Sequence, residues 1–238
     1  MRIACIGGGA AGLYFAISMK LRDAAHEIIV IERNTPDNTF GWGVVFSDAT
    51  IQNLRDNDPA SAQEIFDSFA HWDDIDVHLK SQTVTSGGHG FCGISRSRML
   101  DILQNRATEL GIEITYEKEV ESLEPYLGYD LVVAADGINS RVRETYAEKF
   151  EPSIDLRKNR FIWLGTHHKF DAFTFIFIEI EHGWVWAHAY RFDDNTCTFI
   201  VEMSDDTWHA AGLGNMPLQD GVEWCESLFA EHLQGEKL

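Results

Sequence analysis

Apolar and polar positions near the start of the chain follow the pattern of a strand, a helix and a second strand. Residues 3–6 and 28–31 are short runs of β-favouring apolar side chains, and residues 13–21 form a mostly apolar stretch of helical length. The first run leads directly into Gly7-Gly8-Gly9-Ala10-Ala11-Gly12, and the second run ends at Glu32. This pattern predicts a βαβ unit of about 30 residues with a G-x-G-x-x-G turn after its first strand.

The middle of the chain continues with helical and extended stretches. A helix with a break at Asp58-Pro59 is predicted for residues 48–70, and a helix that ends at Gly111 is predicted for residues 97–110. Strands are predicted for residues 72–84, 91–95, 112–116 and 129–135.

From residue 161 the pattern changes to four aromatic, β-rich stretches that turns separate. They span residues 161–168, 173–180, 184–192 and 196–203, and two short helices are predicted after them. We therefore predict an α/β fold with two domains. The first is a Rossmann-like domain over residues 1–158 with inserted strands near 72–95, and the second is an antiparallel sheet with helices over residues 159–238.

Each glycine of the turn has a role in dinucleotide binding. Gly7 permits the tight turn, Gly9 lets the backbone approach a pyrophosphate, and Gly12 lets the helix lie close to the strand. The N-terminus of the helix offers unpaired N–H groups and a partial positive charge to the phosphates. Glu32 is the acidic residue expected to bind a ribose diol, and its charge disfavours a 2′-phosphate. The unit alone does not distinguish FAD from NAD.

A glycine-punctuated aromatic loop follows the second strand at residues 39–47. An NAD-dependent dehydrogenase would usually enter another crossover helix at this point, whereas a loop of this composition can lie along a flat ring. The local pattern also fits a buried apolar turn that binds nothing.

Charge and composition narrow the class of protein. The 238 residues carry 19 Lys and Arg against 38 Asp and Glu, which gives a net charge of −19. This balance argues against sequence-independent nucleic-acid binding and against adhesion to anionic membranes. No apolar run reaches the roughly 20 residues of a membrane span. The four Cys form no C-x-x-C pair and no two His have H-x-x-x-H spacing, so we expect thiols in a reducing cytoplasm and no metal site.

Four motifs occur in an order that resembles a known family. They are Gly7-Gly8-Gly9-Ala10-Ala11-Gly12; Glu32-Arg33; Ile94-Ser95-Arg96 followed by Leu100, Leu103 and Gln104; and a string from Tyr129 to Arg143 that contains Asp136-Gly137-x-x-Ser140-x-x-Arg143. Together they resemble the single-component FAD-dependent aromatic hydroxylases of the para-hydroxybenzoate hydroxylase type. The loop at residues 40–48 and the stretch His188–Asp194 look like a narrower branch, the hydroxylases of salicyloyl-CoA and 2-aminobenzoyl-CoA.

The resemblance implies a role for each matching residue. Residues 1–158 would be the FAD-binding domain, and residues 159–238 would be part of the substrate domain. The FAD pyrophosphate would lie at Gly7, Gly9, Ala10, Ala11 and Gly12, the adenosine at Glu32 and Arg33, and the flavin phosphate and ribityl side at Arg96 and Gln104. Asp136 and Gly137 would touch FAD near the passage of NAD(P)H, and the loop with Trp42 and Gly43 would border the flavin ring and the substrate.

The resemblance also implies flavin monooxygenation. NAD(P)H would reduce FAD, the reduced flavin and O₂ would form a C4a-hydroperoxyflavin, and one oxygen atom would pass to an aromatic substrate, which is a CoA thioester in the narrower branch. No amino-acid nucleophile is expected, and Trp42, Val44 and His188 are expected only as substrate contacts. We expect a cytoplasmic enzyme that can form homo-oligomers.

One motif of the family is missing. The family has a Gly-Asp motif after the substrate sheet that clamps the flavin from its far side, and this chain contains no Gly-Asp dipeptide. We therefore expect the sequence to be the N-terminal part of a longer enzyme, with a natural short homologue as the alternative, and with FAD retention and activity of this part open. An NAD-dependent dehydrogenase and a non-catalytic nucleotide-binding module remain alternatives. Five basic residues could attract phosphates or a CoA tail, or could form a solvated face: Arg141, Arg143, Arg157, Lys158 and Arg160.

Overall fold

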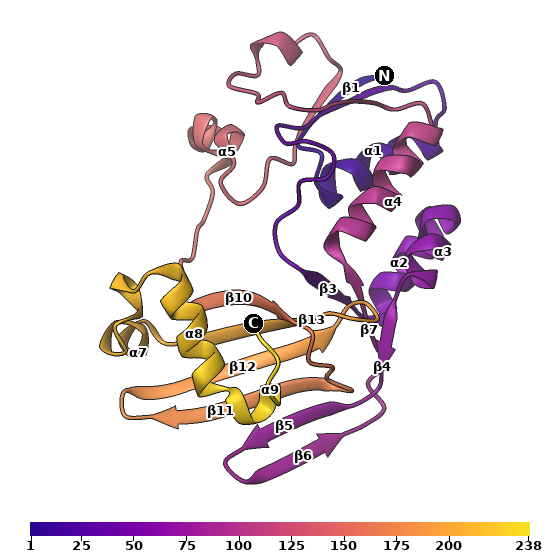
Figure 1. The fold of residues 1–238 in the computed structure, drawn as a ribbon. Helices are drawn as coiled ribbons and strands as arrows, with labels where there is room; N and C mark the ends of the chain where they lie inside the picture. Colours follow the sequence, from indigo (N-terminus) through magenta and orange to yellow (C-terminus); the bar gives the residue numbers. More distant parts are fainter. The chain divides into compact units, whose positions relative to one another are not determined.

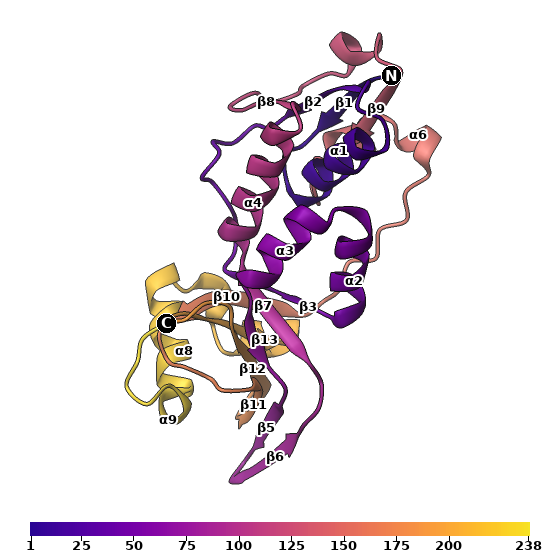
Figure 2. The ribbon, with the colours of Figure 1, turned by 90° about the vertical axis from the view of Figure 1, so that its right-hand side faces the viewer.

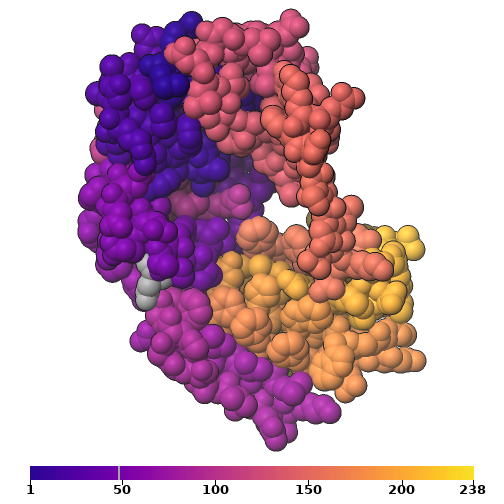
Figure 3. All heavy atoms as spheres, turned by 180° about the vertical axis from the view of Figure 1, so that it is seen from behind, coloured from indigo at the N-terminus to yellow at the C-terminus, as the bar shows by residue number. Residues whose placement is uncertain are grey.

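The computed structural model describes residues 1–47 and 49–238 in full and Asp48 by its backbone (Figure 3). Contacts divide the chain into two compact units. Unit 1 consists of Met1–Thr39, Ile51–Asp67 and Ser97–Asp155, and unit 2 consists of Phe40–Thr50, Ser68–Arg96 and Leu156–Leu238. No helix in the described part of the chain is both long and apolar enough to cross a bilayer. The assignment of an FAD domain to residues 1–158 and a substrate domain to residues 159–238 stays a prediction.

Unit 1 is built on a four-stranded parallel sheet with the strand order β8-β2-β1-β9 (Figure 2). Its strands are β1 (Arg2–Ile6), β2 (Glu27–Ile31), β8 (Glu113–Thr115) and β9 (Leu131–Ala134). The longer helices are α1 (Ala10–Arg22), α2 (Asp48–Asn57), α3 (Pro59–Asp67) and α4 (Arg96–Glu109). Three short ones follow, namely η1 (Glu124–Tyr126), α5 (Arg141–Thr145) and α6 (Ala147–Phe150). The βαβ opening and the helix break at Asp58-Pro59 are confirmed.

The order of the strands makes β1 the point where the chain changes direction across the sheet. The chain passes from β1 through α1 to β2 on one side of β1, and β9 pairs with the other side. In open α/β sheets, ligands bind at the carboxyl ends of the strands where the chain changes direction in this way. The glycine turn follows β1 and Asp136 follows β9, so both predicted elements lie at this switch point.

Unit 2 contains a six-stranded sheet with the order β10-β13-β12-β11-β5-β6 and a three-stranded sheet with the order β3-β7-β4 (Figure 1). The strands of the large sheet are β10 (Arg160–Thr166), β11 (Phe173–Ile180), β12 (Gly183–Arg191), β13 (Cys197–Met203), β5 (Ile75–Leu79) and β6 (Gln82–Ser86). The small sheet is made of β3 (Gly43–Phe46), β4 (Ala70–Trp72) and β7 (Phe91–Ser95). The four strands expected after residue 161 form an antiparallel array, and β5 extends that array by pairing parallel to β11.

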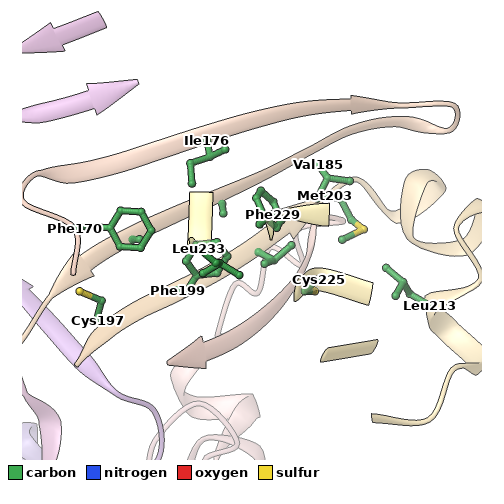
Figure 4. Packing of buried hydrophobic residues seen from close by; sticks show 13 residues of the cluster. Phe170, Ile176, Val185, Cys197, Phe199, Met203, Leu213, Cys225, Phe229 and Leu233 are labelled. Carbon is green, nitrogen blue, oxygen red and sulfur yellow. The ribbon is translucent and has the colours of Figure 1, made fainter. Parts of the chain in front are cut away.

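One face of the large sheet packs on the C-terminal helices α7 (Asp205–Ala210), η2 (Leu213–Asn215), α8 (Leu218–Leu228) and α9 (Ala230–Leu233). Figure 4 shows this core, in which alternate residues of β12 and β13 meet residues from η2, α8 and the segment that leads into α9. Val185, Phe199 and Phe229 have no exposed surface. Because side chains alternate along a strand, the intervening residues lie on the opposite face. That set, which we call the aromatic face, includes Trp163, Phe175, Phe177, Trp186, His188 and Tyr190.

Candidate functional site

The glycine turn of unit 1 depends on the absence of side chains. Gly7 has a φ of +108°, and a Cβ at this position would lie 2.2 Å from the carbonyl oxygen of Ala135. A Cβ at Gly12 would lie 2.0 Å from the carbonyl oxygen of Gly7. The backbone N–H of Gly7 donates to Ile31 over 2.8 Å, and that of Ala135 donates to Ile6 over 2.7 Å. Backbone hydrogen bonds therefore join the start of the turn to β2, and the segment after β9 to β1.

Gly9 differs from these glycines because it faces open space. A Cβ built at Gly9 would meet no atom within 4 Å, and Gly9 is also the N-cap residue of α1. No side chain caps this helix end and no acidic residue lies in its first turn. The first-turn N–H groups and the helix dipole can thus serve an anion, as a pyrophosphate requires.

Glu32 is held by the glycine turn itself. Its Oε2 accepts a hydrogen bond of 2.7 Å from the backbone N–H of Gly8, and its Oε1 accepts bonds of 2.8 Å from the backbone and side-chain nitrogens of Asn34. A Cβ at Gly8 would lie 2.8 Å from the Cβ of Glu32. The G-x-G-x-x-G motif assigns no role to Gly8 or Asn34. The glycine at position 8, which the motif leaves unspecified, is the signal in the sequence that could have indicated this contact. Arg33, the next residue, is exposed.

Asp136 shapes the loop that follows β9. Its Oδ1 accepts a 2.6 Å bond from the Ser140 hydroxyl, and its Oδ2 accepts a 3.3 Å bond from the Val142 N–H. Ser140 is the residue that caps α5, since its hydroxyl accepts from the Arg143 N–H at 3.0 Å. An open cavity of about 380 Å³ borders this loop and is lined by Ala134, Asp136, Gly137, Ser140, Arg143 and Phe150.

Helix α4 carries Gln104 and is anchored by a buried ion pair. The Gln104 side chain donates to the Pro36 carbonyl at 3.1 Å, in the loop after β2. Two residues further on, Arg106 forms a bidentate ion pair with Asp58, with Nε–Oδ2 and Nη2–Oδ1 distances of 2.9 Å. Only 2% of the Asp58 side chain is exposed. Burial raises the pKa of Asp58, but the hydrogen bonds from Arg106 and Ser61 outweigh it, so the pKa lies below its ordinary value.

The loop before β3 packs against the large sheet of unit 2. A Cβ at Gly165 on β10 would lie 2.9 Å from the ring of Trp42, so this ring rests on the backbone of the strand. The backbone N–H of Arg96 donates to the Trp42 carbonyl at 2.9 Å. Phe40 and Trp42 nevertheless expose 65% and 44% of their surface. This exposure contradicts a buried apolar turn and leaves two aromatic rings accessible.

His188 lies on β12 among aromatic rings. Its ring stacks on Phe173 with a centroid distance of 6.1 Å and an interplanar angle of 13°, and it also contacts Phe175. Burial lowers the pKa of His188, and the charge of Glu202 opposes that shift in part. The imidazole is therefore mostly neutral at pH 7. Val44, the other expected substrate contact, is half-buried on β3 and pairs with Ile94.

The expected site residues thus form two groups. Unit 1 brings together the glycine turn, Glu32, Asp136 and Gly137, whereas Gln104 bonds to Pro36 and Arg33 is exposed. Unit 2 brings Trp42, Gly43 and the backbone of Arg96 together. Within the described part of the chain, no cluster of three or more His, Cys, Asp or Glu side chains is placed to hold a metal ion. Burial raises the pKa of the Cys5 and Cys225 thiols to about 12, so both are protonated at neutral pH.

This architecture is the fold of the FAD-dependent aromatic hydroxylases. The chain is similar to the solved tetrameric form of 2-methyl-3-hydroxypyridine-5-carboxylic acid oxygenase, with a TM-score of 0.78 and 20% identity over 96% of this chain and 64% of the other. It is also similar to PqsL of Pseudomonas aeruginosa, described as "a probable FAD-dependent monooxygenase", with a TM-score of 0.66 and 13% identity over 88% of this chain and 62% of the other. At these identities the likeness establishes the fold alone.

Sequence comparison shows that the chain is a homologue of aromatic monooxygenases. It is 38% identical to the salicyloyl-CoA 5-hydroxylase of a Streptomyces species over 100% of this chain and 48% of the relative. It is 32% identical to the protodeoxyviolaceinate monooxygenase of Chromobacterium violaceum over 100% of this chain and 64% of the relative. The chain thus spans about half to two thirds of the length of these relatives. No protein-family model matches it.

Proposed function

We propose that the protein is an FAD-dependent monooxygenase that hydroxylates an aromatic ring. The observation that carries this proposal is the glycine turn at the switch point of the parallel sheet, open at Gly9 and tied to Glu32 through Gly8. The 38% identity to a salicyloyl-CoA 5-hydroxylase supports an aromatic acyl-CoA, such as salicyloyl-CoA or 2-aminobenzoyl-CoA, as the substrate class. FAD, reduced by NAD(P)H, would supply the transfer of oxygen from O₂.

The residues of unit 1 fit the adenosine and phosphate half of FAD. The backbone at Gly9 and the first turn of α1 would hold the pyrophosphate. A carboxylate has about four acceptor positions, and Gly8 and Asn34 use three of those on Glu32. Glu32 would therefore accept one ribose hydroxyl with its remaining position. We assign Arg33, Gln104, Asp136 and Gly137 to FAD as well, with Arg33 beside the adenosine.

The residues of unit 2 fit a planar aromatic ligand. The exposed rings of Phe40 and Trp42 offer flat apolar surface on a loop that the sheet holds in place. His188 would contact the substrate as a neutral imidazole, which can both donate and accept a hydrogen bond. We assign Trp42, Gly43 and Arg96 to the flavin and Val44 to the substrate, and the basic Arg96 would meet anionic phosphate.

Titration of the purified chain with FAD, and separately with NAD, tests this proposal. We expect FAD to be bound with quenching of flavin fluorescence and NAD not to be bound. Gly9→Ala should abolish FAD binding, while Gly128→Ala, which also places a methyl group in open space, should leave it unchanged. Binding of NAD without FAD would favour a dehydrogenase and overturn the proposal. Oxidation of NAD(P)H that depends on salicyloyl-CoA then tests the substrate class.

A further inference from the structure

Both backbone polar groups of Gly43 are bonded to side chains of the large sheet. The N–H of Gly43 donates to Thr198 Oγ1 over 3.1 Å, and the hydroxyl of Tyr190 donates to the carbonyl of Gly43 over 2.9 Å. Thr198 is fully buried and Tyr190 is 6% exposed. Buried polar groups of this kind are costly to leave unpaired, so the two bonds fix the peptide groups on either side of Gly43.

The two side chains are themselves held firmly. Tyr190 on β12 and Thr198 on β13 are direct partners in the antiparallel pairing. The Tyr190 ring stacks against Trp72 and Phe173, with centroid distances of 6.2 and 5.4 Å. Burial raises the pKa of the Tyr190 hydroxyl, with a smaller opposing effect of Thr198, so this group remains a hydrogen-bond donor at physiological pH.

The space around Gly43 admits no side chain that could hold the loop in place of these two hydrogen bonds. A Cβ at Gly43 would lie 2.5 Å from the Cβ of Phe192, so residue 43 cannot use a side chain of its own. The preceding residue, Trp42, is 44% exposed, so burial of its ring cannot fix its direction. The direction of the Trp42 ring must therefore be set by the backbone on which it stands and by its contact with Gly165.

We propose that Tyr190 and Thr198 are positioning residues that clamp Gly43 and thereby orient the exposed ring of Trp42 for a planar aromatic ligand. The identity of that ligand, the flavin or an aromatic substrate, rests on the proposed function. The clamp itself rests only on the contacts within unit 2. Thr198 lies outside the motifs by which the sequence resembles its family, and Tyr190 lies within the stretch His188–Asp194, to which the resemblance gives no positioning role.

Amide hydrogen exchange of the segment 40–46 tests the clamp without any ligand. Thr198→Val removes the acceptor with little change in shape, and we expect exchange at Gly43 to become about tenfold faster. Thr198→Ser keeps the hydroxyl and should restore slow exchange. The control is Thr174→Val, because Thr174 is also buried, on β11, and its hydroxyl donates to the nearby Ala172 carbonyl. Unchanged exchange in Thr198→Val, or equal acceleration in Thr174→Val, would overturn the clamp.

The emission of Trp42 tests the orienting role. Subtracting the spectrum of a Trp42→Phe counterpart from each protein isolates Trp42 among the seven Trp. We expect Thr198→Val and Tyr190→Phe to raise acrylamide quenching of this difference emission, and Thr198→Ser to leave it unchanged. Identical quenching in all variants would refute the orienting role even if exchange changes.

A final measurement links the clamp to ligand binding. If the proposed function holds, Thr198→Val and Tyr190→Phe should weaken FAD or aromatic-substrate binding severalfold at a temperature where circular dichroism shows every variant to be folded, and Thr198→Ser should not. Wild-type protein that binds no FAD would contradict the proposed function, while exchange and emission would still decide the clamp. Wild-type binding that no clamp variant weakens would contradict the clamp alone.

Discussion

The glycine turn after β1 and the loop before β3 both use glycine, and they use it for opposite purposes. In the turn, glycine leaves the backbone uncovered by side chains, and no atom lies within 4 Å of where a Cβ of residue 9 would be. In the loop region, glycine lets an aromatic ring pack directly against the backbone of a neighbouring strand, as the Trp42 ring packs against Gly165 of β10. The turn is fixed by a backbone bond to β2 and by the Glu32 carboxylate, and the loop is fixed by the hydroxyl groups of Tyr190 and Thr198. A polar ligand suits the first construction and a flat apolar ligand suits the second.

Within the turn, Gly12 packs against backbone and Gly9 faces open space, so alanine should affect stability at Gly12 and ligand binding at Gly9. Gly12→Ala places a methyl group 2.0 Å from the Gly7 carbonyl, where only backbone could yield, and should lower the free energy of unfolding by about 3 kcal/mol or more. Gly9→Ala meets no atom within 4 Å and should change stability by less than about 0.5 kcal/mol while it removes FAD binding. Urea denaturation followed by circular dichroism measures both. Equal losses of unfolding free energy in the two variants would contradict the distinction between Gly12, which is required for packing, and Gly9, which is required for ligand binding.

Unit 1 contains a buried ion pair between Arg106 on α4 and Asp58 at the junction of α2 and α3, and a substitution tests what it contributes to stability. Arg106→Met leaves the Asp58 charge buried without its partner and should cost about 3–5 kcal/mol at pH 7. Arg141→Met breaks an exposed pair with Glu119 and should cost less than about 1 kcal/mol. Because the pKa of Asp58 is lowered in the folded chain, its contribution is complete above about pH 3.9 and is lost as pH falls through the lowered value.

The same pair sharpens the comparison between the units. Hydrogen exchange should accelerate in α3 and α4 of the Arg106→Met protein and should stay unchanged in the loop before β3, since that loop is fastened within unit 2. Equal acceleration in both places would show that the two units unfold together.

Gly165→Ala tests the packing of the Trp42 ring on β10, and we expect it to reduce stability less than Gly12→Ala does. The new methyl group would lie 2.9 Å from the ring of Trp42, and an exposed ring can move aside where backbone cannot. The free energy of unfolding should fall by about 1 kcal/mol, at the low end for an overpacked site. Quenching of Trp42 emission should rise, because the ring leaves its contact with the strand. A large loss of stability without a change in quenching would contradict this account.

Both the turn and the loop could be predicted from the sequence, but the contacts that hold the loop could not, for a physical reason. Gly7, Gly12 and Glu32 lie within one βαβ unit, so their spacing alone fixes which atoms meet. Gly43 is held by Tyr190 and Thr198, which are 147 and 155 residues away, and no local pattern encodes such pairs. The four aromatic strands were visible from their alternation, yet the parallel pairing of β5 with β11 was not, since it joins segments about a hundred positions apart. The sequence around Asp58 indicates only a helix break, because the partner of Asp58, Arg106, lies on another helix.

The smallest expected effect concerns the pH dependence of the two faces of the large sheet. Burial lowers the pKa of His188 on the aromatic face, and burial together with nearby His78 and His168 lowers the pKa of His232 on the helix face. A lowered histidine pKa gives a contribution to stability that is complete above about pH 6.5 and is lost as pH falls through the folded-state value. The urea midpoint of the wild-type chain should therefore decline between pH 7.5 and pH 5.5.

His188→Gln and His232→Gln separate the two contributions. Each should flatten part of this decline, and the double variant should flatten more than either one, because the two rings lie on opposite faces and titrate independently. FAD or an aromatic ligand that covers the aromatic face should shift the decline attributable to His188 to lower pH and leave that of His232 in place. A decline that His188→Gln does not alter would show that this ring is freely hydrated, and the aromatic face would then lack the dry surroundings that a neutral substrate contact needs.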